Sequence, residues 1–220
     1  MRRTIAVVLL IAGCPGSQGN DFTPANGSTM NQPTADPELE RQLRLSRPKG
    51  GHPADVRERD RAVAWLLEHP ERAYPTVLAR ATTSPGDASL IELLGRFRKV
   101  ESTSVLMQAF QRPEPVRRYA AAALGLSPDP EARKALIEAL AEPSTQVAAI
   151  AGLEASGDAT LGPRIRELLR SPTAEVRWVA VHACKSLGCI SEQELSELAR
   201  GDADPSVREL AEKGPTKHTQ

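Results

Sequence analysis

The feature of this 220-residue chain that most restricts its fold is a short motif, valine followed by arginine, that recurs at multiples of about 30 residues. The copies begin at Val56, Val116, Val176 and Val207, and Val147 lies between the second and third. The first interval is twice as long as the others and therefore spans two units. Self-similarity at such a period is typical of stacked structural repeats. The chain is therefore expected to fold as an array of repeats.

Within one unit the apolar side chains have helical spacing. They follow Val116 at the third, fourth, seventh and eighth positions, at Tyr119, Ala120, Ala123 and Leu124. This spacing predicts one amphipathic helix. We expect Gly125 and the segment 127–130 to end that helix, with Asp129 as the N-cap and Pro130 as the first residue of a second helix.

The same two-helix cycle can be followed along residues 54–213. Its clearest upstream and terminal helices are predicted at 54–68, 71–82, 87–98, 102–111 and 204–213, and Ser191 with Glu194 has the form of a capping box. One helix pair cannot bury its apolar stripe alone, so the pairs must stack. The fold class expected is all-α, a right-handed α-solenoid of about five helix pairs plus a terminal half repeat. Residues 36–53 are expected to form a short leading helix and a loop, and residues 214–220 a polar tail.

Composition supports a helical protein and disfavours two classes of partner. Alanine, leucine and arginine are in surplus, and all three favour helices. The chain carries 28 basic and 28 acidic side chains, and only 3% of its residues are aromatic. Such a chain lacks the positive surface and the stacking side chains of a general nucleic-acid binder. We therefore expect no nucleic-acid partner, and a monomer.

The N-terminus has the form of an export signal. Arg2 and Arg3 precede an apolar stretch at 4–12, which is too short to span a bilayer that needs roughly 20 apolar residues. Removal of residues 1–13 takes away these two arginines and no acid, so 26 basic and 28 acidic side chains remain, a net charge of −2. Residues 15–35 are rich in Pro, Gly, Ser, Thr and Asn, and we expect them to form a disordered tether.

The residues that end the apolar stretch, Ile11-Ala12-Gly13-Cys14, resemble the lipobox of bacterial lipoproteins. The resemblance implies that residues 1–13 are a signal peptide, that Cys14 receives a lipid, and that residues 14–35 join this anchor to the folded part. Pro15 stands where aspartate commonly retains such proteins at the inner membrane, so the resemblance favours the outer membrane of a bacterial envelope. The alternative is an ordinary signal, cleaved a few residues later, in which Cys14 carries no lipid.

The repeat itself also resembles a known family. Its pattern is Pro-x-x-Val-Arg, an alanine-rich helix ending in Leu-Gly, a short Asp/Pro turn and a leucine-rich second helix, most clearly over 113–200. This is similar to the HEAT repeat in the short form also found in the phycocyanobilin lyases. The resemblance implies a concave face lined by the second helix of each unit. On that face we expect a partner-contact surface whose guanidinium groups bind carboxylates. Its candidate residues are Arg133, Lys134, Arg164, Arg166 and Arg170. The alternative is a solvated surface of compensating charges.

The remaining cysteines lie close together near the end of one helix. Cys184 occupies the position that Leu124 holds in its unit, so it is expected to pack in the core. His182 with Cys184 and Cys189 offers too few ligands for a metal site, and we expect no metal and no cofactor. We expect two unpaired thiols. The alternative is a disulfide, which export to an oxidising space and a chain reversal at Gly188 would permit.

No catalytic motif is recognisable in the sequence. The expected function is therefore that of a non-catalytic protein, not an enzyme: a membrane-anchored scaffold that binds a protein partner through its concave face. The alternatives are a lyase-like enzyme or enzyme-accessory protein, and a purely structural envelope lipoprotein. A pocket that gathers histidine, cysteine or paired carboxylates would favour the lyase-like alternative, and an open groove without perturbed titratable groups would count against it.

Overall fold

The computed structural model of the chain describes residues 36–48 and 52–213, and every regular element in these two ranges is a helix. None of these helices combines the length and the apolar character needed to cross a membrane. Cys14, the signal and the tether predicted at 1–35, and the tail at 214–220 lie outside the described residues. The α-helices are α1 (Pro37–Leu45), α2 (Pro53–Glu68), α3 (Pro70–Thr83), α4 (Ala88–Phe97), α5 (Thr103–Phe110), α6 (Val116–Leu126), α7 (Pro130–Ala139), α8 (Gln146–Ser156), α9 (Gly162–Glu167), α10 (Ala174–Leu187), α11 (Glu192–Gly201) and α12 (Pro205–Glu212).

Local capping signals fix where many of these helices begin. The Asp129 side chain accepts a hydrogen bond from the Glu131 N–H, and Pro130 is the first helical residue of α7, as predicted. Ser191 and Glu194 form the predicted capping box of α11, with bonds in both directions. Such caps satisfy the N–H groups that the first turn leaves without a helical partner.

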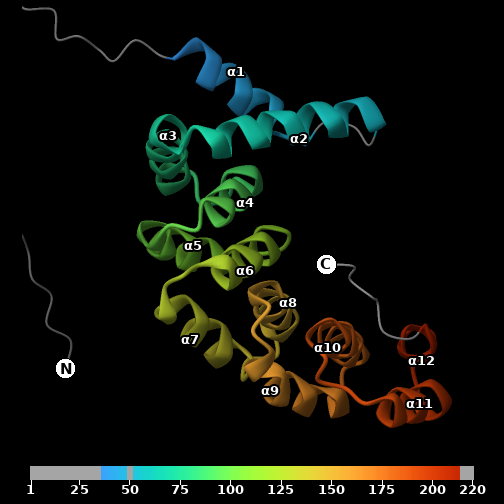
Figure 1. Cartoon of the computed structure of the whole chain (residues 1–220). Helices are drawn as coiled ribbons and strands as arrows, with labels where there is room; N and C mark the ends of the chain where they lie inside the picture. The colour runs from blue at the N-terminus through green and yellow to red at the C-terminus, as the bar shows by residue number, and fades with distance from the viewer. Residues whose placement is uncertain (1–35, 49–51, 214–220) are drawn as a thin grey trace, which may run out of the picture. The chain divides into compact units, whose positions relative to one another are not determined.

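The helices form five successive pairs, and α12 adds a half unit, so the predicted all-α solenoid is confirmed. The first helices of the later units (α4, α6, α8, α10 and α12) follow one another in one row, and the second helices (α5, α7, α9 and α11) form another (Figure 1). Consecutive first helices pack directly on each other. The second helix of the fourth pair is short: α9 ends at Glu167 and continues as the 3₁₀ turn Leu168–Arg170.

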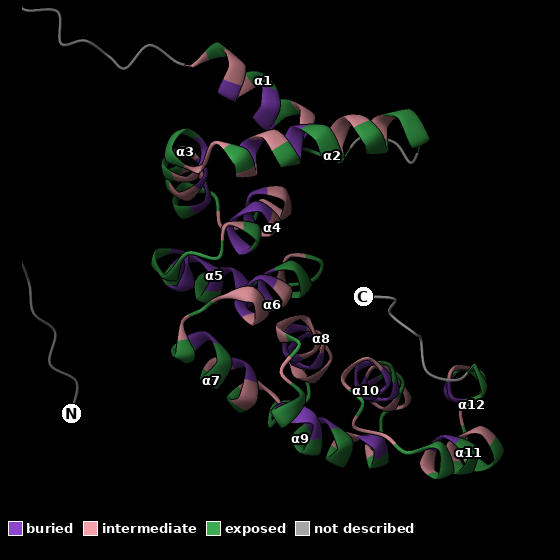
Figure 2. Cartoon of the chain, viewed as in Figure 1, coloured by how far each residue is buried: buried purple, intermediate pink, exposed green. Residues whose placement is uncertain are grey.

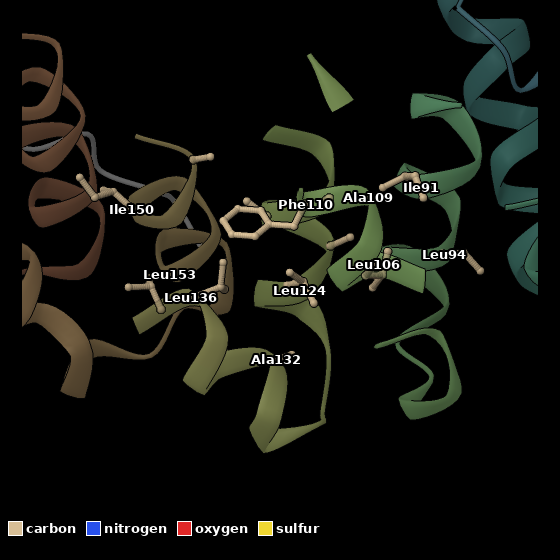
Figure 3. Close-up of a cluster of buried hydrophobic side chains, with 14 of the residues drawn as sticks. Ile91, Leu94, Leu106, Ala109, Phe110, Leu124, Ala132, Leu136, Ile150 and Leu153 are labelled. Carbon is tan, nitrogen blue, oxygen red and sulfur yellow. The ribbon is translucent and has the colours of Figure 1, made fainter. Parts of the chain in front are cut away.

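A continuous apolar core joins the units. Buried residues lie mainly on the parts of the helices that face neighbouring helices (Figure 2). Leu94, Leu124 and Ile150 come from three successive first helices, and each is less than 2% exposed. Leu106 and Leu136 complete this part of the core from the second helices α5 and α7 (Figure 3). No unit contains a separate core, so each unit depends on its neighbours for stability.

Two glycines allow α6 and α8 to approach backbone to backbone. A Cβ atom on Gly152 would lie 2.5 Å from the carbonyl oxygen of Ala121, and one on Gly125 would overlap the carbonyl of Gly152. Gly125 was expected to end its helix, but α6 runs to Leu126 and this glycine serves the contact instead. Because the first helices approach so closely, neighbouring units bend toward the first-helix row (Figure 1). The expectation that second helices line the inner side of this bend is therefore wrong.

In two of the units, the arginine of the valine–arginine motif reaches the loop that leads to the next unit. The Arg117 guanidinium donates to the carbonyl of Phe110, the last residue of α5, and, over 2.8 Å, to that of Ser144 in the loop between α7 and α8. Arg177 makes two bonds to the carboxylate of Asp202, at 2.9 and 2.7 Å, and Asp202 is almost fully buried. The period of the motif thus reflects contacts between units.

The end of α10 is closed by a disulfide between Cys184 and Cys189. Gly188 adopts a left-handed conformation, with φ of 70°, and the Cys189 N–H donates to the Cys184 carbonyl over 2.8 Å. This helix ending brings the two side chains together, where an apolar contact is usual. The structure therefore shows the disulfide, and not the two unpaired thiols that we expected. Cys184 is fully buried, in keeping with its predicted core position.

Candidate functional site

A groove of about 580 Å³ lies on the first-helix row. We call it the histidine groove. It lies along α8 and α10 and extends to α12 and to Arg118 of α6. Its lining residues are Arg118, Val147, Ala151, Glu154, Ala174, Glu175, Trp178, Val179, His182, Asp204 and Ser206.

A histidine held between an aromatic ring and a carboxylate is the most distinctive chemical group of this groove. The His182 Nδ1 atom lies 3.0 Å from Oε1 and 3.2 Å from Oε2 of Glu154 on the neighbouring helix. The rings of Trp178 and His182 are stacked, with centroids 5.7 Å apart and planes 12° from parallel. Trp178 and His182 share one face of α10 because they are four residues apart. The contacts restrain the imidazole in one orientation.

The floor of the histidine groove is apolar and its rim is charged. Val147, Ala151 and Val179 supply the floor. Glu175 and Asp204 contribute carboxylates at the rim, and the Asp204 side chain also caps α12. Trp178 remains 38% exposed, which is unusual for a large aromatic side chain in a folded protein. An apolar hollow with a few convergent polar groups is typical of a ligand site.

This arrangement is suited to proton transfer. When Glu154 accepts a hydrogen bond from Nδ1–H, the Nε2 atom of His182 keeps a lone pair that can accept a proton. A carboxylate that orients an imidazole in this way is a recurrent arrangement for general acid–base chemistry. In the described part of the chain no group of three or more His, Cys, Asp or Glu side chains is placed to hold a metal ion.

The five basic residues predicted as a contact surface lie on the second-helix row and do not converge. Arg133 pairs with Asp158 at 3.2 Å, and Arg166 pairs with Glu194 at 2.7 Å. Lys134 is 3.6 Å from Glu131 of its own helix. Arg164 and Arg170 are exposed. Two of the five therefore join neighbouring units through ion pairs.

The carboxylates that face these arginines are strongly stabilised in their charged form. The Ser191 N–H and hydroxyl, followed by the Arg166 guanidinium, lower the pKa of Glu194 from 4.5 to about 2. The hydroxyl and N–H of Thr160, with a smaller contribution from Arg133, lower the pKa of Asp158. Local caps are thus the main cause, and the arginines add to them.

The residues of the histidine groove were not recognised as a site in the sequence. In the sequence, His182 stands out only as a potential metal ligand with Cys184 and Cys189, and no motif includes Trp178 or Glu154. One signal was available: Glu154 and His182 are 28 residues apart, close to the repeat period. Residues separated by one period occupy similar heights on neighbouring first helices, so such pairs are candidates for contact.

Comparison with known proteins supports the repeat type. A family model described as PBS lyase HEAT-like repeat matches residues 116–142, which comprise α6, its turn and α7. Among solved structures, the complex of CpcE and CpcF of phycocyanin lyase from Nostoc sp. PCC7120 is similar, with a TM-score of 0.46 and 19% identity. That match covers 89% of this chain and 79% of the other. A search of curated proteins finds no match.

These comparisons correct one expectation. The absence of catalytic motifs led us to expect a protein that is not an enzyme. The repeat matched at 116–142 takes its name from a lyase. This match corrects the expectation of a non-catalytic protein, and the lyase-like alternative becomes the better one.

Proposed function

We propose that this chain is a lyase-related protein, either an enzyme or the accessory subunit of one, that works at the histidine groove. The observation that carries the proposal is the imidazole of His182, held between Trp178 and Glu154 over an apolar floor. The match to a lyase-named repeat at 116–142 supports it.

The chemistry of a lyase gives each of these side chains a role. Such enzymes break a bond without water, and in an elimination a base removes a proton next to the leaving group. In our proposal Nε2 of His182 accepts that proton, the electrons of the broken C–H bond form a double bond, and the leaving group departs with the electron pair of the bond that held it. Glu154 stabilises the imidazolium that forms. Trp178 and the apolar floor bind the non-polar part of the substrate and exclude water. As an accessory subunit, the chain would use the same groove to hold the substrate segment of a protein partner.

The second part of the proposal concerns location. We propose that Cys14 carries a lipid and that residues 15–35 tether the repeats to the outer membrane of a bacterial envelope. The resemblance of residues 11–14 to a lipobox supports this. Two or three acyl chains, at about 0.8 kcal/mol per buried CH₂, anchor a protein durably. A Cys14→Ala variant should remain an unprocessed precursor without lipid; a variant with the mature wild-type mass that still partitions into detergent would refute the anchor.

Site-specific photo-crosslinking in native membranes tests the working surface. A photoreactive residue at Glu175 on the rim of the histidine groove should capture a substrate or partner, and one at Arg164 on the second-helix row serves as the comparison. Capture from Arg164 alone would refute the histidine groove as the working surface. It would favour the partner-contact surface predicted from the sequence, which also includes Arg133, Lys134, Arg166 and Arg170.

The captured molecule then allows a functional assay. If the chain is an enzyme, it should convert the molecule by itself, and His182→Gln should lower the rate by at least 100-fold, the lower range for loss of a general base. If it is an accessory subunit, the rate of the captured enzyme should rise when wild-type chain is added and not when His182→Gln is added. Equal rates with wild type and His182→Gln in both assays would exclude the proposed role of the histidine.

A further inference from the structure

A second groove lies on the other side of α6, between α4 and α6, and it has a volume of about 410 Å³. We call it the arginine groove. Its walls are Leu67, Ala122, Ala123 and Leu126, together with the ring of Tyr119, which is 40% exposed. Its charged residues are Glu92, Arg96 and Arg98. None of these lines the histidine groove.

The charges of the arginine groove do not balance. The two carboxylate oxygens of Glu92 are already engaged, one with Arg59 at 2.5 Å and the other with Arg96 at 2.9 Å. Arg98 is exposed, and no ion pair or side-chain hydrogen bond is found for its guanidinium within the described ranges. One acid against two arginines among the lining residues leaves a net charge of +1 beside an aromatic ring.

The backbone of Arg98 has an uncommon conformation. Its φ is 51° and its ψ is 44°, and it is the one residue other than glycine with a positive φ among the described residues. This left-handed position follows the last residue of α4, where glycine or asparagine is usual because a Cβ atom is disfavoured there. An arginine at this position is unfavourable for the fold. Such outliers are found preferentially at functional sites.

We infer that the arginine groove binds an acidic segment of a protein partner. Two carboxylates of the segment would pair with the free guanidinium of Arg98 and with Arg96, since Arg96 can exchange its exposed bond to Glu92 for a partner's carboxylate. The Tyr119 ring and the apolar wall would receive an aliphatic or aromatic side chain between those acids. The net charge of +1 favours an acidic partner, and a binding role for the guanidinium accounts for an arginine at this positive φ. This binding is separate from the proposed chemistry at His182.

Fluorescence anisotropy of a labelled eight-residue peptide of alternating glutamate and leucine, titrated with the full-length protein in detergent, tests the inference. The glutamate peptide should bind at least tenfold more tightly than the same peptide with glutamine for glutamate. Its affinity should fall as the salt concentration rises. Equal affinity for the two peptides, or competition by free glutamate as effective as by the peptide, would overturn the inference.

Variants at Arg98 separate charge from backbone strain. Arg98→Gly and Arg98→Asn should each raise Tm by a degree or more, because both residues tolerate positive φ, and should each weaken peptide binding at least fivefold. Arg98→Lys should keep most of the binding without gaining stability. Arg164→Ala removes the same charge from the second-helix row and should bind as wild type. Unchanged binding by Arg98→Gly and Arg98→Asn, or an equal loss in Arg164→Ala, would refute the site.

Failure of this inference can be distinguished from failure of the proposed function. His182→Gln should bind the glutamate peptide as wild type does, because His182 lies in the other groove. If His182→Gln weakened peptide binding as much as Arg98→Gly does, the peptide would be binding at the histidine groove, and the arginine groove would not be a separate site.

Discussion

Two glycine residues set the distance between α6 and α8. Gly125 and Gly152 face each other so closely that neither has room for a side chain. The sequence makes Gly125 visible only as a helix-ending residue, because glycine is a common helix terminator. Its packing role depends on Gly152, a full repeat further along the chain, and contacts of that kind are not encoded in local spacing.

We predict that Gly152→Ala destabilises the protein by about 2 kcal/mol, within the range for overpacked sites. The added Cβ would lie 2.5 Å from the Ala121 carbonyl oxygen, so α6 and α8 would have to move apart. Urea denaturation of the full-length protein measures the change. Gly201→Ala is the matched control, since a Cβ there meets nothing within 4 Å. It should stabilise α11 by about 0.5 kcal/mol through helix propensity. A Gly152→Ala protein as stable as wild type would show that the helices separate without cost.

Among the elements, α11 depends on the capping box at its start. Glu194 bonds to the Ser191 N–H and hydroxyl and pairs with Arg166 of α9. Because these contacts hold the pKa of Glu194 near 2, the charged carboxylate stabilises the folded state above pH 4.5. That contribution is lost as the pH falls from 4.5 toward 2.

We predict that Glu194→Gln reduces the acid sensitivity of the protein. Between pH 7 and pH 3 the free energy of unfolding should fall by about 1 kcal/mol more in wild type than in Glu194→Gln. This figure allows for solvent screening of the partly exposed carboxylate. Urea unfolding at the two pH values measures the difference. Glu192→Gln is the control, because Glu192 starts the same helix without taking part in the capping box. Identical pH dependence of wild type and Glu194→Gln would contradict the role of the carboxylate.

The contact between α10 and the loop that follows α11 depends on one ion pair. Arg177 and Asp202 have side chains only 13% and 4% exposed, and they share two hydrogen bonds. We predict that Arg177→Ala costs about 3 kcal/mol, because it leaves a buried carboxylate without its partner. Lys213→Ala breaks the exposed pair with Glu209 and should leave the stability nearly unchanged. Thermal unfolding of both variants measures the two losses of stability. Equal losses would show that the buried ion pair stabilises the fold no more than the exposed one.

The sequence predicts elements better than it predicts the faces they present. The caps at Asp129 and Ser191 were predictable because they involve residues two or three positions apart. The disulfide forms where α10 ends in a left-handed residue. Gly188 permits that conformation, but a glycine can also adopt others, so the sequence alone does not predict the disulfide. The histidine groove depends on which row of helices lies on the inner side of the bend. That choice is made by close contacts such as the one at Gly152, which join different repeats.

Across the whole repeat array, stability should vary with position. Units in the middle, such as those of α6 and α8, are packed on both sides, whereas α1 and α12 have a neighbour on one side only. We predict that amide hydrogens of α6 and α8 exchange most slowly. Those of α1 and α12 should exchange about 30-fold faster, which corresponds to roughly 2 kcal/mol of local stability. Hydrogen–deuterium exchange with mass spectrometry measures this gradient. Uniform protection of all helices would show that the array unfolds as one cooperative unit.

The backbone contact between α6 and α8 also has a mechanical consequence. A stack whose helices already touch along one row cannot be compressed further there, so that row acts as the hinge line when the stack flexes. Thermal flexing then opens and closes the spaces between the second helices and leaves those between the first helices nearly constant in width. Both grooves proposed as binding sites border first helices, where the elastic deformation of the array is smallest and the geometry of a bound ligand is best preserved.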